Sequence, residues 1–477
     1  MRRWFGLGVG VVVACGPTPP PESDTDGGSS SAATTGGGSM TGGGPTSPQP
    51  STDPTITTAA PPTTGAVTTE IDPPTTGLET ATEPPTTSNT STTGTTGEEC
   101  VDASGCPPGQ VCIAGACVGV AEVPSCDVPS VVTTIVPLMH LPTSLVAADL
   151  DSDGDVDIAV GAPAISVIEV LFNTGVKDFV TSELIALVPA TGDLQLAAGD
   201  LDVDGDTDLA IAQEVASDVN VLVGEAGLWT VKPKLDAQSG TRRVWFADVD
   251  INGSVGGDLV TIGESSPTIG TWIGDGFGNY QAGPSFDLPV SLAVSVVDAS
   301  GDALSDLVGP TSLDGFTTVR VFSRIDGAGF EEQATLTAGG TVISQALAGE
   351  LDNVVSREIV ALTQDDVGGL VAVWRAPQPG QWEAAPLLAR APARFTGGLL
   401  ADVNDDTLLD LVVVGEQATV SVMFGGGDGS FFCEHTFELL APAPRELLAV
   451  GDVDGDGRLE IVAGAPDLKE IQVIATL

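Results

Sequence analysis

The stretch DLDSDGDVDIAVGAP, residues 149–163, places an aspartate at every second position for nine residues and then turns apolar. Similar stretches begin at Asp200, Asp402 and Asp452, where the sequence reads DLDVDGDTDLAIA, DVNDDTLLDLVVVG and DVDGDGRLEIVAGAP. An acidic cluster followed by an apolar run is therefore a repeated unit of this chain of 477 residues.

Seven such loops can be aligned, and their spacing is about fifty residues. Their first acids are Asp149, Asp200, Asp248, Asp298, Glu350, Asp402 and Asp452. Each unit reads as four short strands, because apolar or alternating runs stand on both sides of the loop. A period of this length is typical of propellers and solenoids, whose repeats bury their apolar faces against neighbouring repeats.

The residue before each first acid is small, which favours a closed ring over an open stack. These residues are Ala148, Gly199, Ala247, Val297, Gly349, Ala401 and Gly451. Innermost strands crowd around a central channel, so small side chains there are a packing requirement. The sequence therefore predicts an all-β fold, a seven-bladed β-propeller over residues 127–477.

The two ends of this region complement each other. The last unit stops at its third strand, EIQVIATL, whereas SVVTTIVPL precedes the first unit as a strand without a blade. We expect residues 131–138 to form the outer strand of the last blade, which would remove an exposed edge.

The loop pattern DxDxDGxxD supplies the oxygen atoms that a hard cation such as Ca²⁺ requires. The expected ligands are carboxylates at positions one, three, five and nine and the carbonyl at position seven, with glycine at six for the turn. An EF-hand is excluded because position twelve lies inside a strand. Without a cation the neighbouring carboxylates would repel one another. We therefore predict structural Ca²⁺ at about four sites or more.

The predicted ligands belong mainly to blades one, two, six and seven. They are Asp149, Asp151, Asp153, Asp155 (through its carbonyl) and Asp157; Asp200, Asp202, Asp204, Asp206 (through its carbonyl) and Asp208; Asp402, Asn404, Asp406 and Asp410; and Asp452, Asp454, Asp456 and Glu460. Blade four, with Asp298, Asp302 and Asp306, is a weaker candidate. Blade three has a two-residue insertion before Asp258, and blade five, with Val354 at position five, is expected to be empty.

These loops resemble the FG-GAP and VCBS repeat family, the calcium-loop propellers that include the integrin alpha-subunit head. GAP triplets stand at 161–163 and 464–466, and FGGGDGSF at 424–431 is similar to the family's other signature. The resemblance covers residues 127–477 and implies cation loops on one face and ligand contacts on the other. Such propellers serve adhesion, scaffolding and polysaccharide cleavage, so the fold does not decide the function.

The front of the chain is a candidate export signal. Two arginines precede a short apolar run that ends in VVAC at Cys15, and this tetrapeptide resembles the lipobox of bacterial lipoproteins. We expect residues 1–14 to be a signal peptide and Cys15 to carry a lipid; an ordinary secretory signal is the alternative. Residues 15–98 are rich in Thr, Ser, Pro and Gly, so we expect a disordered tether. In the lipoproteins that this signal resembles, an aspartate directly after the lipidated cysteine favours retention in the inner membrane. Gly16 stands at that position here, which favours the outer membrane.

Six cysteines remain beside Cys15, an even number that suits an exported protein. Cys100, Cys106, Cys112 and Cys117 lie close together and predict a small disulfide-rich module over residues 99–120. Their connectivity stays open: Cys100 with Cys112 and Cys106 with Cys117 is one option, and a metal site is an alternative. A disulfide between Cys126 and Cys433 would reinforce the closure of the ring if the outer strands lie close enough.

Nothing in the sequence indicates catalysis. The chain has one Tyr and two His, and it contains no nucleophile triad, phosphate loop or zinc spacing. Its net charge of -49 excludes nucleic acid as a natural partner. Five arginines fall in links that we place on the face opposite the cations, where they form a hypothetical basic ring for an acidic ligand such as a uronate-bearing polysaccharide. They are Arg242, Arg243, Arg390, Arg394 and Arg445, and scattered solubilising charge is the alternative.

We expect a monomeric binding module of the bacterial cell envelope, anchored in the membrane through Cys15, that recognises a polysaccharide or an envelope protein and is not an enzyme. One alternative is a polysaccharide-cleaving enzyme that uses His140, Tyr280 or an arginine. The other is a purely structural envelope scaffold.

Overall fold

The computed structural model describes Cys100 and residues 106–126, 131–175, 179, 181–187, 192–250, 257–263, 268–325, 329–352, 354, 356–384, 386–391 and 393–476. All described residues belong to one compact unit. The predicted signal peptide, Cys15 and the tether lie outside the described residues. No described helix is long and apolar enough to cross a membrane.

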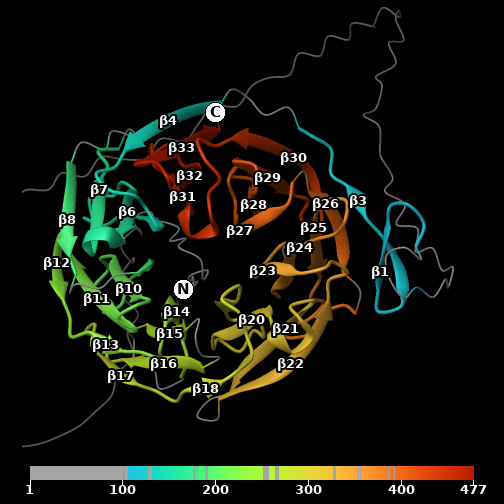
Figure 1. Ribbon diagram of the computed structural model, residues 1–477, viewed down its shortest axis with the longest axis horizontal. Coiled ribbons are helices and arrows are strands. Elements are labelled where there is room, and N and C mark those ends of the chain that lie inside the picture. The colour runs from blue at the N-terminus through green and yellow to red at the C-terminus, as the bar shows by residue number, and fades with distance from the viewer. Residues whose placement is uncertain are drawn as a thin grey trace, which may run out of the picture. The chain divides into compact units, whose positions relative to one another are not determined.

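Seven sheets of four or five strands, the blades, follow one another along the described chain (Figure 1). Blade one contains β5 (Ser144–Ala148), β6 (Asp157–Ala162), β7 (Val167–Phe172) and β8 (Thr181–Ala186). Blade two contains β9 (Leu194–Gly199), β10 (Asp208–Gln213), β11 (Asp218–Glu225), β12 (Leu228–Val231) and β13 (Leu235–Asp236). Blade three contains β14 (Thr241–Ala247), β15 (Asp258–Gly263), β16 (Thr268–Gly274), β17 (Tyr280–Ala282) and β18 (Phe286–Asp287).

The remaining four blades repeat the same order. Blade four contains β19 (Ser295–Val297), β20 (Asp306–Pro310), β21 (Thr318–Ile325) and β22 (Gly329–Thr337). Blade five contains β23 (Ile343–Gly349), β24 (Glu358–Gln364), β25 (Gly369–Trp374) and β26 (Leu387–Ala391). Blade six contains β27 (Phe395–Ala401), β28 (Asp410–Gly415), β29 (Thr419–Gly425) and β30 (Phe431–Glu438), and blade seven contains β31 (Leu448–Gly451), β32 (Glu460–Ala465) and β33 (Glu470–Thr476).

The first strand of each blade lies innermost, and each contacts the first strands of the two neighbouring blades (Figure 1). These strands end at the small residues that precede the acidic loops. A Cβ atom on Gly451 would lie 2.8 Å from the Cγ1 atom of Val156 and 3.4 Å from the Cβ atom of Ala147. Crowding between inner strands therefore explains the small residues, and the predicted seven-bladed ring is confirmed.

The apolar core is divided among the spaces between neighbouring blades. Seven buried clusters occur in the described chain, and each joins side chains of two adjacent blades. The cluster between blades one and two, for example, combines Ile168 and Val170 with Leu196 and Leu209. Each blade thus buries its faces only against its neighbours, as the repeat predicts.

The ring is closed by a strand from the other end of the propeller sequence. Strand β4 (Val131–Pro137) pairs antiparallel with β33, so that Val131 stands opposite Thr476 and Pro137 opposite Glu470. The expected outer strand of the last blade is confirmed. Because of this pairing, β33 is not left as an exposed edge strand of blade seven.

The disulfide-rich module packs against the propeller. Its hairpin, β1 (Gln110–Ile113) and β2 (Ala116–Gly119), carries Val111 and Ile113, which join the core cluster between blades four and five. Disulfides link Cys100 to Cys112 and Cys106 to Cys117, which is the connectivity considered above. The module is thus stabilised by the propeller core as well as by its disulfides.

Residues between the module and β4 follow the outside of blades five and six. Strand β3 (Ala121–Glu122) pairs parallel with β26, and Ser125 forms a parallel bridge with Glu434 in β30. A disulfide then joins Cys126 to Cys433, whose Cα atoms are 5.5 Å apart. The expected third disulfide is therefore present, and the segment before residue 127 also contributes to the propeller.

Candidate functional site

The acidic loops connect the first and second strands of the blades, and four of them bring three carboxylates together. Oxygen atoms of the three lie within 4.8 Å of one another in each group. The groups are Asp149, Asp151 and Asp157; Asp200, Asp202 and Asp208; Asp248, Asp250 and Asp258; and Asp452, Asp454 and Glu460. Blades one, two, three and seven therefore each contain a cluster that could bind a metal ion.

Unsatisfied oxygen atoms in three of these clusters fit a cation. Asp149 Oδ1, Asp202 Oδ1 and Asp452 Oδ1 are buried, and no described residue donates a hydrogen bond to any of them. A buried carboxylate oxygen without a donor is unfavourable, because it has lost its hydration and gained nothing in return. A hard cation bound between the three carboxylates would satisfy such atoms.

The acid at position nine has a structural role that sequence reasoning missed. In blade one the two carboxylate oxygens of Asp157 accept hydrogen bonds from the backbone N–H groups of Leu150 and Asn173, at 2.9 and 2.7 Å. One bond closes the loop and the other ties it to the end of the third strand. The equivalent acids in blades two to six are Asp208, Asp258, Asp306, Glu358 and Asp410, and each makes both bonds.

Burial raises the pKa of several of these acids. The pKa of Asp157, Asp208 and Asp410 rises to about 7, and the backbone N–H groups oppose the rise without cancelling it. Glu358 shares the two bonds and the raised pKa, although its blade has no convergent carboxylates among the described residues. The position-nine acid is therefore needed for the blade itself, whether or not a cation is bound.

The acids at positions five and seven have other partners. Asp153, Asp204 and Asp456 each accept a hydrogen bond from the backbone N–H two residues later, at 2.9 to 3.0 Å, and none belongs to a convergent group. The Asp206 side chain accepts hydrogen bonds from Ser152 Oγ in the loop of blade one and from the Ala226 backbone. Positions one, three and nine form the clusters, so the predicted contribution of position five remains a prediction.

Blade three differs from the sequence prediction. Its loop has a two-residue insertion and is not among the loops with predicted ligands, yet Asp258 joins Asp248 and Asp250. Asp258 lies at the start of β15, where its carboxylate accepts hydrogen bonds from the Val249 and Gly274 backbone N–H groups. Asp258 keeps the same position relative to the second strand as the equivalent acids of the other blades. The position of the acid at the start of that strand, and not its distance from the first acid of the loop, is therefore the sequence signal that identifies this site.

Blades four and six form no convergent carboxylate group among the described residues. Position three is Ser300 in blade four and Asn404 in blade six, so each loop lacks one carboxylate. The Nδ2 group of Asn404 donates to Asp406 at 3.0 Å. Cation binding by Asp298, Asp302 and Asp306 and by Asp402, Asn404, Asp406 and Asp410 therefore remains a prediction.

The opposite face of the ring has a cavity of about 250 Å³. Residues at the start of the first strands of blades one, two, three and seven line it, among them Thr143, Gln195, Arg243 and Leu447. Each of the links that contribute to it is short. The cavity forms because several links meet near the central channel.

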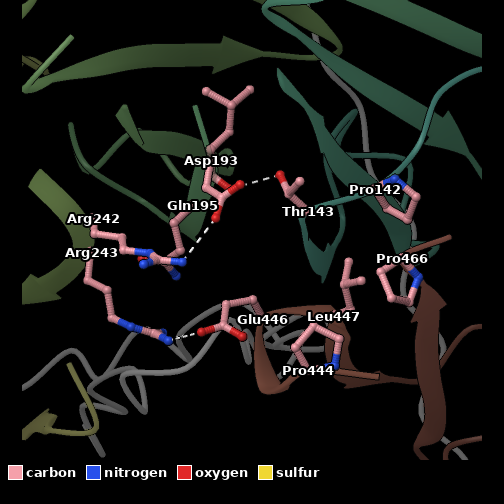
Figure 2. Close-up of a pocket in the computed structure, with 11 residues that line it drawn as sticks. Pro142, Thr143, Asp193, Gln195, Arg242, Arg243, Pro444, Glu446, Leu447 and Pro466 are labelled. Carbon is pink, nitrogen blue, oxygen red and sulfur yellow. Dashed lines mark hydrogen bonds and ion pairs between the residues drawn. The ribbon is translucent and has the colours of Figure 1, made fainter. Parts of the chain in front are cut away.

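Three of the five predicted arginines meet beside this cavity. Arg242 Nη2 lies 3.0 Å from Asp193 Oδ2, and Arg243 forms an ion pair with Glu446 (Figure 2). Arg445 Nε lies 3.3 Å from Glu446 Oε1, and its Nη2 donates to the Leu292 carbonyl of the link before blade four. Charged side chains from different links thus lie close together near the central channel. Each of the three arginines pairs with Asp193 or Glu446.

Arg390 and Arg394 lie elsewhere, so the five do not form a ring. Both Asp365 carboxylate oxygens accept from Arg390 Nη1 at 2.8 Å, in blade five. Arg394 donates to Gln364 Oε1 and the Asp365 carbonyl. Neither arginine lines the cavity, and the described partners of both belong to residues 364 and 365 at the end of β24 in blade five.

The two histidines and the tyrosine, which include His140 and Tyr280 of the enzymatic alternative, occupy separate places. His140 Nδ1 lies 3.3 Å from Glu169 Oε2 in blade one. Tyr280 donates its hydroxyl hydrogen to the Gly257 carbonyl in blade three, and burial raises its pKa. His435 Nδ1 lies 3.3 Å from the Cys126 carbonyl on the outside of blade six. These three side chains therefore do not share one site.

Comparisons with known proteins agree with this architecture. The FG-GAP-like repeat family matches residues 149–211 and 402–463, which begin at the acidic loops of blades one and six. No curated protein sequence matches the chain. A solved structure of BBS1N in complex with ARL6DN, soaked with mercury, is similar with a TM-score of 0.50 and 11% identity, over 72% of this chain and 94% of that chain.

Two further structures are similar at lower scores. The same complex soaked with lead has a TM-score of 0.48 and 12% identity, over 74% of this chain and 98% of that chain. A structure on the recognition of non-reducing terminal N-acetylglucosamine by an Agrocybe aegerita protein has a TM-score of 0.44 and 16% identity, over 63% of this chain and 80% of that chain. The chain is thus an all-β ring of seven blades that contains FG-GAP-like repeats, and the acidic loops at the start of these repeats agree with this match.

Proposed function

We propose that the protein is a binding module whose propeller is stabilised by Ca²⁺ and whose opposite face recognises a polysaccharide. The observation that carries this proposal is the division between the two ends of the blades. Acidic clusters with unsatisfied oxygens lie at one end, and a polar cavity lies at the other. Cations would thus hold the loops without occupying the ligand face, and FG-GAP propellers are typically binding folds.

Calcium is the cation that these loops suit best. The clusters contain only carboxylate oxygens, the ligands that hard cations prefer. Ca²⁺ accepts six to eight such ligands in flexible geometry, whereas Mg²⁺ demands a near-octahedral set. We place structural Ca²⁺ in blades one, two, three and seven.

The anchor and the location belong to the same proposal. Cys15 would carry a lipid at the outer membrane of a bacterial envelope, and the tether would hold the monomeric propeller away from the membrane. The VVAC motif and the three disulfides, which suit an oxidising compartment, support this arrangement. Labelled fatty acid should enter the wild-type protein but not a Cys15→Ser variant; equal labelling of both would contradict the anchor.

The ligand class can be tested with the full chain on immobilised acidic and neutral polysaccharides, in Ca²⁺ and in EDTA. We expect retention in Ca²⁺ without release of fragments, and weaker retention in EDTA. Release of fragments would instead support a polysaccharide-cleaving enzyme. Failure to bind any polysaccharide, combined with recovery of envelope proteins, would support a scaffold.

A further inference from the structure

The cavity on the link face has two unlike walls. Arg242 and Arg243 extend from β14 toward Asp193 and Glu446 on one side, whereas Pro142, Pro444 and Pro466 lie across from the arginines (Figure 2). A volume of about 250 Å³ is just below the range of roughly 300 to 1,000 Å³ for drug-sized ligand pockets. The cavity therefore suits one small unit with a polar edge and an apolar face.

Charged side chains lie close together at this cavity. Three guanidinium groups, of Arg242, Arg243 and Arg445, face two carboxylates, of Asp193 and Glu446. Glu446 accepts hydrogen bonds from both Arg243 and Arg445, and Arg445 also donates to the backbone carbonyls of Ser344 and Leu292. Burial together with nearby Arg445 lowers the pKa of Arg243 to about 9.

Arg243 also has a hydrogen-bond donor to spare. The residue is only 3% exposed and lines the cavity, and its Nη2 is engaged by Glu446. Its Nε–H, in contrast, has no acceptor among the described residues. A buried guanidinium N–H without a partner is unfavourable, and a ligand oxygen would satisfy it.

We propose that this cavity binds the carboxylate of an acidic sugar, a uronate unit, with Arg243 as the main contact and Arg242 as the second. This inference rests on the proposed function and names the ligand class and the site. A uronate carries one carboxylate, which could accept a hydrogen bond from the Arg243 Nε–H, and its pyranose ring offers a C–H face to the proline wall. The half-exposed Asp193 and Arg242 leave the ligand a way in from solvent.

Methyl glucuronoside and methyl glucoside are matched probes, because they differ only in the carboxylate. We would measure their binding to the full chain in Ca²⁺ by saturation-transfer NMR, which detects weak complexes. Wild-type protein is expected to bind the glucuronoside at least tenfold more tightly than the glucoside. Arg243→Gln should lose about tenfold or more of this affinity and Arg242→Gln a smaller part.

Arg390→Gln is the control, because it removes an ion-paired arginine of blade five far from the cavity and should leave binding unchanged. If Arg243→Gln unfolds, as judged by circular dichroism, the more exposed Arg242→Gln carries the test alone. Equal binding of the two sugars, or no effect of the cavity variants, would overturn the inference while retention on polysaccharide keeps the proposed function. Binding of acetate as tight as that of the glucuronoside would point to acidic peptides and overturn the sugar class, and no retention on any polysaccharide would overturn both proposals.

Discussion

Thr407 shows what the loop demands of a single position. It stands at position six with φ of 72°, where blades one, two and seven have glycine at 96°, 99° and 91°. The backbone N–H at this position reaches the first acid of the loop, as Thr407 does with Asp402 Oδ2 at 2.7 Å. A β-branched residue in the left-handed region costs roughly 1–2 kcal/mol, so blade six keeps the turn despite its side chain.

Thr407→Gly should therefore stabilise the protein. We expect the free energy of unfolding to rise by about 1 kcal/mol, since part of the relieved strain is offset by the greater entropy of unfolded glycine. Urea denaturation of the variant and the wild type in EDTA measures this change in the free energy of unfolding without a contribution from bound cations. The reverse change, Gly154→Ala, should lower stability by a similar amount, although an added Cβ there would meet no atom within 4 Å. A loss of stability in Thr407→Gly would contradict the backbone argument.

Glu358 allows the position-nine acid to be tested apart from a metal. Its oxygens accept from the Leu351 and Ala376 backbone N–H groups at 2.7 and 3.2 Å. In Glu358→Gln the amide has one acceptor oxygen, so one backbone N–H would lose its bond. The free energy of unfolding should fall by about 1–3 kcal/mol, equally in Ca²⁺ and in EDTA. A loss seen only in Ca²⁺ would contradict the structural role.

The same variant has a defined pH dependence. Burial raises the folded-state pKa of Glu358 above its ordinary value of 4.5. The folded state therefore binds the proton more tightly than the unfolded state, and the contribution of Glu358 to stability declines as pH rises from 4.5 through the raised pKa. Because glutamine does not titrate, the cost of Glu358→Gln should be larger near pH 4.5 than at neutral pH. Urea denaturation across this range tests the sign, and a growing cost would reverse it.

Among the loops, the sequence predicts where most clusters form but not how they are held. The alternating acids reveal blades one, two and seven, because their register follows one motif. The cluster in blade three is missed because the insertion shifts Asp258 by two residues relative to the motif. In the structure, the start of β15 and two backbone hydrogen bonds hold Asp258 beside the other two acids. The second role of the position-nine acid is missed because one of its two donors lies at the end of the third strand, at a distance that no local pattern encodes.

Asp250→Asn tests the added cluster in blade three. It removes one of the three convergent carboxylates, so the chain should bind one Ca²⁺ fewer than the wild type. Isothermal titration after EDTA dialysis gives the number of bound ions. Asp352→Asn in blade five is the matched control, because its loop has no convergent group among the described residues, and should leave the number unchanged. An unchanged number in Asp250→Asn would remove blade three from the sites.

The whole ring depends on contacts between distant parts of the chain. Closure by β4 follows from the missing strand of the last blade, so the sequence predicts it. The docking of Val111 and Ile113 between blades four and five does not follow, because two apolar residues in a short hairpin show no periodicity. That only three of the five arginines come together does not follow either, because partners such as Asp365 and Glu446 fix the position of each guanidinium group.

The Cys126–Cys433 disulfide should stabilise this closure. It joins residues 307 apart in sequence, and it holds the segment before β4 against blade six. Replacing both cysteines by serine should lower the free energy of unfolding by roughly 2–4 kcal/mol. Denaturation under non-reducing conditions measures this, with the wild type treated identically. An unchanged stability would show that strand pairing alone closes the ring.

Thermal unfolding of the full chain in millimolar Ca²⁺ and in EDTA tests the cation-stabilised propeller. Each site filled to a hundred times its dissociation constant adds about 2.7 kcal/mol to the folded state. We predict a clearly higher Tm in Ca²⁺, and a smaller rise in Asp149→Asn, which removes one position-one carboxylate. An equal Tm in Ca²⁺ and EDTA would contradict the account, because the convergent carboxylates would then hold no stabilising cation.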